Sequence, residues 1–292
     1  MSWLPRTGLG NKLYLWARGW AFARLNGLRF QCYGWTRLKA GPLLRREKSS
    51  RLYLGQFRRE PPLAGLVLGV RWLIADRVFD PPVEVIAPRS RSTLFIFRDL
   101  QANCVADDSF RALVGLREEL REALLARLTA PCRRTLEAAT PPLVGIHVRR
   151  GDFRHFDWWQ PIENFCQRLQ NVRQLAGACL PATVYSDGTN EELAPLLALP
   201  QVSPAPPNPD IVDLLQLSRS QVLIASRAST FSSWAGFLSD RVVLRDRKFD
   251  HQLCRPTAVN AVWFEGSVAD EAGAWPGLAK QNLQAIAAQV AA

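Results

Sequence analysis

Short apolar runs alternate with helix-like segments through the second half of the chain, and this rhythm constrains the fold more than any other feature. The apolar runs are residues 143–148, 182–185, 221–225 and 241–244. The segments with the apolar spacing of helices are residues 162–175, 191–199, 210–217 and 232–238. Strands that are apolar on both faces are typical of a parallel sheet covered by helices on each side. The sequence therefore predicts an α/β fold.

The first half of the chain differs from the second in charge. Residues 1–140 hold 24 Lys and Arg against 12 Asp and Glu, whereas residues 141–292 hold 13 against 14. Leucines at helical spacing over residues 109–128 predict a helix whose N-cap is Ser109. The pair Pro141–Pro142 follows soon after and interrupts the chain where the charge bias ends. We predict two domains, over residues 1–140 and 141–292, of which the first faces something anionic.

Composition narrows the class of protein. Hydrophobic residues make up 48% and charged residues 22% of the chain, which excludes a disordered or fibrous protein. The six cysteines are scattered without a CxxC pair, which predicts reduced thiols and no metal site. Residues 63–75 form the longest apolar stretch, shorter than the ~20 residues needed to span a bilayer. Residues 1–7 lack the apolar core of a secretion signal, so we expect a cytoplasmic protein, soluble or peripheral on the inner face of the plasma membrane.

Eight cations stand against a single acid between residues 37 and 59. A run of this kind is usually a solvated loop, and it also suits an anionic membrane surface. An isoelectric point near 10.0 makes a nucleic-acid-binding protein the alternative outside the enzymes. The cations are concentrated in one half, however, and no zinc-finger, RNP-like or helix-turn-helix signature accompanies them. We therefore expect no nucleic-acid partner.

Polar clusters follow three of the predicted strands, at residues 147–152, 186–188 and 226–233. The carboxyl ends of parallel strands share one edge of a sheet, where ligands of such folds bind. Arginine pairs well with phosphate oxygens, and hydroxyls and free N–H groups at a helix start add donors. A carboxylate there accepts from a nucleobase or ribose. The three clusters together predict a nucleoside-diphosphate site that needs no metal.

Each of these residues also has an ordinary structural explanation. His147 inside an apolar strand suits a hydrogen-bonded core histidine, and Arg149 and Arg150 suit surface charges. Ser232 and Ser233 suit plain helix caps. The conjunction of the clusters at one edge favours the binding site.

Four blocks along the chain carry a more specific signal. Residues 145–153 read GIHVRRGDF, residues 8–13 GLGNKL, residues 185–187 YSD, and residues 229–238 STFSSWAGFL. They are similar to the HxRRGD signature, the GLGNQMFQYA opening, the FSDD-like element and the STFSWWGAWL block of the α1,2-fucosyltransferases (glycosyltransferase family eleven). A looser HxRxxD form is shared with α1,6- and protein O-fucosyltransferases. The chain resembles this family over nearly its whole length, with the blocks in family order.

The resemblance implies a GT-B-like fold, in which two Rossmann-like domains face a central cleft. Residues 1–140 would form the acceptor-side α/β domain, and residues 141–292 would form the GDP-sugar-binding domain. It implies that L-fucose moves from GDP-fucose to a galactoside hydroxyl in α1,2 linkage, with inversion and with no metal or other cofactor. By position, Arg149 would stabilise the leaving β-phosphate, and His147 and Asp152 would hold the nucleotide and orient that arginine. The other donor-binding residues would be Arg150, Asp187 at guanine or ribose, Thr230, Ser232 and Ser233 at the diphosphate, and Gly8, Gly10 and Asn11.

The resemblance also suggests a general base, the group that takes the proton of the acceptor hydroxyl. In the α1,6 relatives a carboxylate lies ten residues after the motif histidine, and Asp157 occupies that position here. Trp158 and Trp159 follow it and would offer stacking surfaces for sugar. We therefore expect Asp157 to act as the base.

Three departures from the family pattern bear on specificity and on the start of the fold. Lys12 replaces the usual Gln, and Ser233 replaces the first Trp of a pair. These changes indicate either an altered acceptor choice or a diverged activity. The strand that precedes the GLGN block in the family has only residues 1–7, with Pro5, to form it, so we expect it to be missing or to begin upstream.

An α1,6- or O-fucosyltransferase, or a transferase of another GDP-sugar, stays open beside the α1,2 interpretation. The expected partners are GDP-fucose and a galactose-terminated glycan.

Overall fold

A computed structural model describes most of the chain. The described residues are 1–36, 52–100, 110–151, 153, 159–245, 254, 261–266 and 275–291.

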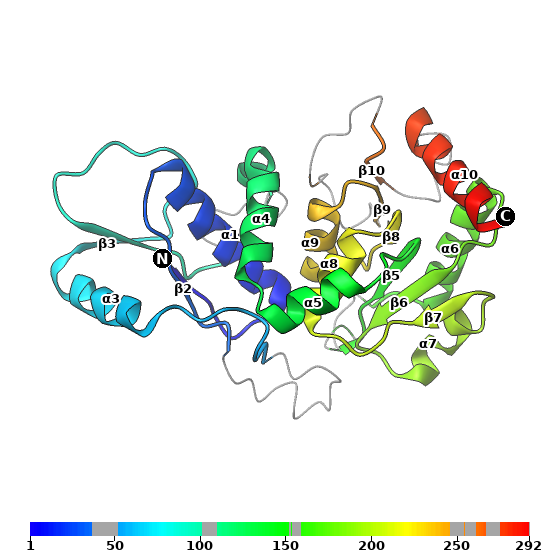
Figure 1. Cartoon of the computed structure of the whole chain (residues 1–292), viewed down its shortest axis with the longest axis horizontal. Coiled ribbons are helices and arrows are strands. Elements are labelled where there is room, and N and C mark those ends of the chain that lie inside the picture. The colour runs from blue at the N-terminus through cyan, green and yellow to red at the C-terminus, as the bar shows by residue number, and fades with distance from the viewer. Residues whose placement is uncertain are drawn as a thin grey trace.

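The second half forms a six-stranded parallel sheet, seen on the right of Figure 1. Its strands are β5 (Val144–Val148), β6 (Ala182–Ser186), β7 (Val202–Pro204), β8 (Val222–Ile224), β9 (Val242–Leu244) and β10 (Phe264–Gly266). They lie in the order β10-β9-β8-β5-β6-β7, and every neighbouring pair is parallel. Counted from β5, this is the 3-2-1-4-5-6 order of the Rossmann fold, whose strand order reverses between its first and fourth strands.

Helices cover both faces of this sheet, as apolar parallel strands require. One face carries α6 (Ile162–Ala176), α7 (Asn190–Leu197) and α10 (Gly277–Ala291), whose apolar side chains share a core with the strands. The other face carries α8 (Asp210–Ser218) and α9 (Thr230–Leu238). Pro209 precedes α8, and Thr189 caps α7 with a reciprocal capping box to Glu192. The predicted α/β layering with parallel strands is confirmed.

The described part of the first half contains four short strands. They are β1 (Ser2–Trp3), β2 (Cys32–Tyr33), β3 (Asp76–Phe79) and β4 (Thr93–Ile96). β1 pairs with β2, β3 pairs with β4, and a parallel bridge from Ser2 to Phe97 joins the two pairs. The strand before the GLGN block, which was expected to be missing or to begin upstream, is present as β1, although only two residues long. Its pairing to β2 across α1 (Leu9–Leu25) makes a small βαβ unit.

The other helices in the described part of the first half are α3 (Pro62–Ile74), η1 (Arg111–Leu116), α4 (Arg117–Arg127) and α5 (Ala130–Ala138). Helix α4 lies beside α1, whereas α3 lies apart from it at the outer left edge of the molecule (Figure 1). The single helix predicted over residues 109–128 is wrong in one respect, because a 3₁₀ segment comes first and α4 begins at Arg117. Leu120 and Leu124 still face the core as the leucine spacing predicted. Ser109, the predicted N-cap, lies outside the described residues.

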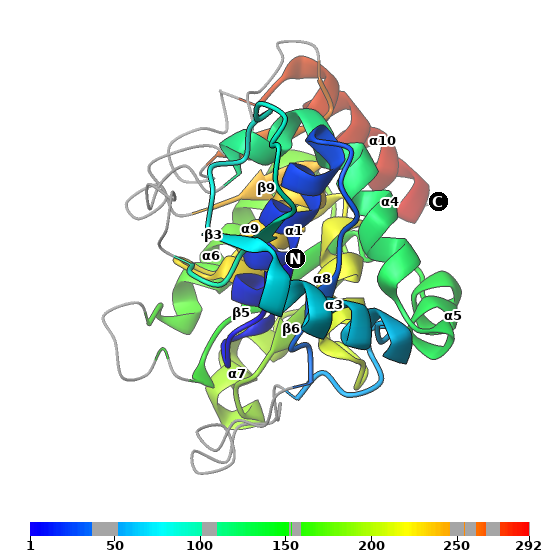
Figure 2. The ribbon, with the colours of Figure 1, turned by 90° about the vertical axis from the view of Figure 1, so that its left-hand side faces the viewer.

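The two halves share one apolar core. Trp16 of α1, Leu124 of α4 and Trp234 of α9 belong to the same buried cluster. Figure 2 shows α1 in front of α8 and α9, between them and the small N-terminal sheet. The proposed domain boundary near residue 140 coincides with the start of the large sheet, and it stays a prediction.

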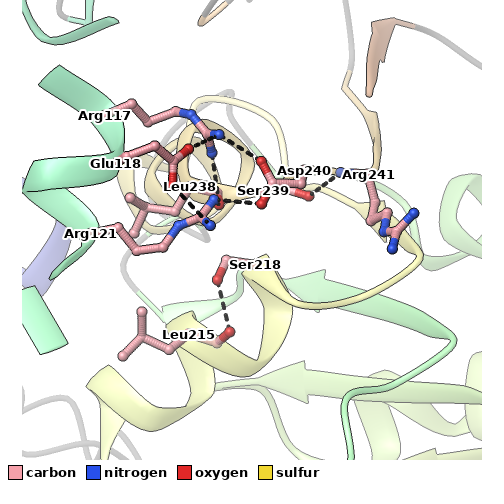
Figure 3. Close-up of polar contacts among 9 residues, drawn as sticks. All are labelled: Arg117, Glu118, Arg121, Leu215, Ser218, Leu238, Ser239, Asp240 and Arg241. Carbon is pink, nitrogen blue, oxygen red and sulfur yellow. Dashed lines mark hydrogen bonds and ion pairs between the residues drawn. The ribbon is translucent and has the colours of Figure 1, made fainter. Parts of the chain in front are cut away.

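A polar contact reinforces this junction. Arg117 and Arg121 of α4 both pair with Asp240, in the turn between α9 and β9, and both donate to the carbonyl of Leu238 (Figure 3). Burial alone would raise the pKa of Asp240, but the hydrogen bonds and charges of the two arginines outweigh it and hold the pKa below its usual value. The charge of Asp240 thus ties the first half to the second.

Two further findings concern the sequence expectations. Cys32, Cys132, Cys166, Cys179 and Cys254 are free thiols, and Cys104 lies outside the described residues. No helix in the described part of the chain is long and apolar enough to cross a membrane.

Candidate functional site

The candidate site lies where the strand order of the large sheet reverses, between β5 and β8. After β5 the chain passes to α6 on one face, and after β8 it passes to α9 on the other. Ser226, just beyond β8, joins the two strand ends, because its Oγ donates to the carbonyl of His147 at 2.7 Å and accepts from the backbone N–H of Arg149 at 2.8 Å. Ligands of doubly wound sheets bind at such a reversal, beyond the carboxyl ends of the strands.

His147 is buried at this point and fixed by the start of α9. Its Nδ1 lies 2.6 Å from Oγ of Ser232, which also accepts the backbone N–H of Ser226 at 3.1 Å. Its ring stacks on that of Phe231, with centroids 4.8 Å apart. Burial, together with the nearby charge of Arg149, lowers the pKa of His147 to about 3. The imidazole is therefore neutral at physiological pH and joins β5 to α9.

Arg149 is oriented by a carboxylate from the neighbouring strand end. Its guanidinium forms an ion pair with Oδ2 of Asp187, and the other oxygen, Oδ1, accepts the backbone N–H of Arg150 at 2.7 Å. The guanidinium carbon also lies 5.5 Å from the ring centroid of Phe153. Asp187 was expected to read guanine or ribose, and the structure places both of its oxygens on protein donors. Each oxygen can accept a further hydrogen bond.

Arg150 occupies a different environment from Arg149. It is buried, its guanidinium donates to the carbonyl of Gln160 at 2.6 Å, and it lies 4.9 Å from the ring centroid of Trp159. Gln160 in turn accepts the backbone N–H of Arg227 through Oε1 at 2.7 Å. Arg150 thus ties the loop after β5 to the segment after β8. These contacts are with protein groups, and its predicted part in donor binding stays a prediction.

The N-termini of α9 and α1 meet beside this cluster. Ser229 caps α9 by accepting the backbone N–H of Ser232. Gly10 lies so close to this end that a Cβ there would come within 2.6 Å of the carbonyl carbon of Thr230 and 2.8 Å of the nitrogen of Phe231. The indole of Trp234 donates to the carbonyl of Gly10 at 2.9 Å. Glycine is required at position 10 because the two helix ends touch through their backbones.

Other residues of the GLGN and STFS blocks differ in what they contact. Gly8 is the N-cap of α1, and Asn11 is half-buried with no polar partner among the described residues. Ser233 is buried, donates to the carbonyl of Ser229 and accepts from Arg245. Lys12 is also buried, and its ammonium binds the carbonyls of Gly34 and Trp35. The two departures from the family pattern at Lys12 and Ser233 therefore hold the fold together.

The catalytic role of two predicted residues rests on the sequence alone. Asp152 and Asp157 lie outside the described residues. Their described neighbours show how the loop begins: Gly151 has a φ of +22°, and the backbone N–H of Phe153 donates to the carbonyl of Arg150 at 2.8 Å. The turn after Arg150 therefore starts in a conformation that favours glycine.

One residue of the site, Gln160, had no part in the sequence interpretation. Ser226 was included in the polar cluster that follows a buried strand, and the structure shows which groups it joins. Gln160 precedes a proline and carries no signal of its own in the sequence. The described residues also contain no group of three His, Cys, Asp or Glu side chains that could hold a metal ion.

Comparison with known proteins agrees with this geometry at the level of the fold. No protein-family model matches the sequence, and no curated protein matches it. The structure of the α1,6-fucosyltransferase NodZ co-crystallised with GDP is similar, with a TM-score of 0.51, 15% identity, and coverage of 84% of this chain and 94% of that chain. The chain has a GT-B-like fold.

Two further structures are more distant. Fucosyltransferase NodZ from Bradyrhizobium gives a TM-score of 0.49 at 14% identity, covering 84% of this chain and 94% of that chain. A FUT1 variant of Arabidopsis thaliana in complex with GDP gives 0.45 at 15% identity, covering 84% of this chain and 69% of that chain. Identities this low leave the reaction to be argued from the site itself.

Proposed function

We propose that this protein is an inverting fucosyltransferase that moves L-fucose from GDP-fucose to a hydroxyl of a glycan. The observation that carries the proposal is the position of Arg149, which stands at the strand reversal with its guanidinium fixed by Asp187 and its backbone fixed by Ser226. A pre-oriented guanidinium suits a diphosphate, because its planar fork pairs with two phosphate oxygens. The resemblance of the HxRRGD block and the GT-B-like fold support the same donor.

In this proposal the acceptor oxygen attacks the anomeric carbon of fucose, and the bond to the β-phosphate breaks on the opposite side. Negative charge develops on that phosphate as GDP leaves, and Arg149 stabilises it. His147, which is neutral, and Asp187 act as positioning residues, since His147 binds Ser232 at the start of α9 and Asp187 holds the guanidinium of Arg149. The N-termini of α9 and α1 supply further donors near the diphosphate. Asp157 takes the acceptor proton, and no metal takes part.

The acceptor we propose is a terminal galactose, joined in α1,2 linkage. The similarity of all four sequence blocks to the α1,2 family supports it. An α1,6 linkage, transfer to a protein hydroxyl, or use of another GDP-sugar would employ the same donor site. Acceptors therefore have to be compared directly.

The test is an incubation with GDP-fucose, GDP-mannose and UDP-sugars, each with a panel of galactosides and with chelator present. We expect GDP release and a fucosylated product with GDP-fucose, and loss of product with a galactoside that lacks the 2-hydroxyl. Arg149→Lys should lower kcat/KM by about a hundredfold, because the bidentate fork is lost while the charge remains. Arg134→Lys, at an exposed site on α5, is the matched control and should retain wild-type rates.

Several results would overturn the proposal. Equal rates for Arg149→Lys and wild type would remove Arg149 from the donor site. If product forms only with a different GDP-sugar, the proposed donor is wrong. If fucose is attached at another hydroxyl, the proposed α1,2 linkage is wrong. Steeply salt-dependent binding of DNA with no donor turnover would favour a nucleic-acid-binding protein.

A further inference from the structure

Helix α3 presents to solvent an apolar surface that the described residues leave uncovered. None of its residues, 62–74, is buried. Its large exposed side chains are Leu63, Leu66, Val67, Val70, Trp72, Leu73 and Ile74. Leu73 is 84% and Leu66 67% exposed. Isolated apolar residues are common on protein surfaces, whereas a contiguous set of this size marks a contact with another molecule or with a membrane.

Only a narrow strip of α3 faces the protein. Leu68 is partly buried against Met1, Leu94 and Ile96 of the small N-terminal sheet, and Ala75, just after the helix, joins it there. Figure 1 shows α3 at the outer left edge of the molecule, far from the large sheet, and Figure 2 shows it on the face turned to the viewer. The rest of its circumference is free to enter an apolar medium.

The charges around α3 are mostly positive. Between residues 58 and 98 the exposed cations are Arg58, Arg59, Arg71, Arg77, Arg89, Arg91 and Arg98, and the exposed acids are Asp76 and Glu84. Arg58 and Arg59 precede the helix, while Arg77 follows it and lies over the ring of Trp72 at 5.5 Å. Cations at both ends of an apolar helix complement a negatively charged surface.

We propose that α3 is a membrane-docking helix, which inserts into the interfacial layer of an anionic bilayer while the flanking arginines bind lipid phosphates. At 13 residues it is too short to span, and apolar helices of this length are typical of interfacial segments. Trp72 adds a side chain that favours the membrane–water boundary. A protein partner would cover one face of the helix, whereas a lipid phase accommodates the nearly complete exposure that α3 shows. This inference is independent of the proposed transfer activity.

The experiment is co-sedimentation of the full chain with sucrose-loaded vesicles. One set contains phosphatidylcholine with about 30% of the anionic lipid phosphatidylglycerol, and the other contains phosphatidylcholine alone. We expect wild type to bind the anionic vesicles and to bind the neutral ones at least tenfold less. Leu66→Glu/Leu73→Glu should lower binding to anionic vesicles by about a hundredfold, since each leucine contributes about tenfold on transfer to lipid.

A matched control and a charge variant separate the two contributions. Leu278→Glu changes an exposed leucine on α10, at the opposite end of the molecule in Figure 1, and should bind as wild type does. Arg59→Gln/Arg91→Gln should weaken binding about twenty-fivefold, or about fivefold for each cation. Circular dichroism checks that all variants are folded.

The proposal fails if wild type does not sediment with anionic vesicles at low salt, or if Leu66→Glu/Leu73→Glu binds them as tightly as wild type. Analytical ultracentrifugation tests whether a second copy of this chain binds the surface instead. If wild type forms a dimer that the double leucine variant loses, and vesicles bind neither, then the surface is an interface between two copies of this chain.

Discussion

The contact between Gly10 and the start of α9 gives the sharpest prediction about the fold around the site. A Cβ at position 10 would lie 2.5 Å from Oγ1 of Thr230, 2.6 Å from its carbonyl carbon and 2.8 Å from the nitrogen of Phe231. Real Cβ atoms do not approach this closely, and two of the three neighbours are backbone atoms that no rotamer change can move. Gly10→Ala must therefore push α1 away from α9.

The expected cost follows from two opposing effects. Overpacking of this kind destabilises by about 1–3 kcal/mol, and replacing glycine in a helix returns at most ~1 kcal/mol. We expect a net loss of about 1–2 kcal/mol, which lowers Tm by about 2–4 °C for each kcal/mol in a chain of this size. Differential scanning calorimetry or urea unfolding measures it. Fucosyl transfer should fall as well, because the two helix N-termini separate.

Two variants test the reasoning. Gly69→Ala lies in exposed α3, where a Cβ meets no atom within 4 Å, and should stabilise by about 0.5–1 kcal/mol. Gly10→Ala/Thr230→Ala removes Oγ1 but leaves the backbone contacts, so it should recover little stability. An unchanged Tm in Gly10→Ala, or full recovery in the double variant, would refute the close backbone approach.

Four further predictions follow from the polar contacts. Asp187→Asn should lower kcat/KM for fucosyl transfer about tenfold to a hundredfold, because Arg149 loses a charge-assisted partner; unchanged kinetics would contradict this. Burial lowers the pKa of His147 to about 3, so unfolding takes up a proton between pH ~6.5 and ~3. The free energy of unfolding should therefore decrease as the pH is lowered through this range, by up to ~1.4 kcal/mol per pH unit. A His147→Asn variant should lose this dependence in urea titrations. Burial raises the pKa of Asp213 to about 7, so stability falls as pH rises from ~4 to ~7, and Asp213→Asn should raise Tm at pH 8 but not at pH 4. Asp240→Asn should cost at most ~1 kcal/mol, less in 1 M salt, since Asp240 is half-exposed; a larger, salt-independent loss would disprove it.

The sequence by itself determined the large sheet. Residues 144–148, 182–186 and 222–224 are apolar on both faces, and such runs have no stable place except between two helical layers. Because parallel strands end at one edge, His147, Arg149 and Asp187 could be grouped before any coordinates were known. β7, β10 and α10 were missed. β7 contains Ser203 and Pro204, and β10 contains Glu265 and Gly266, so neither strand is a continuous apolar run, and the last helix follows no predicted strand.

Only the tertiary structure decided what each polar side chain contacts. Arg149 and Arg150 are adjacent and chemically identical, yet one pairs with Asp187 and the other is buried beneath Trp159. Which strand lies beside β5, and therefore which carboxylate reaches Arg149, depends on pairings between residues far apart in the chain. The exposure of α3 is likewise invisible in the sequence, where the same apolar run would suit a core helix. Local patterns fix which elements form, and long-range packing fixes which of their faces remain uncovered.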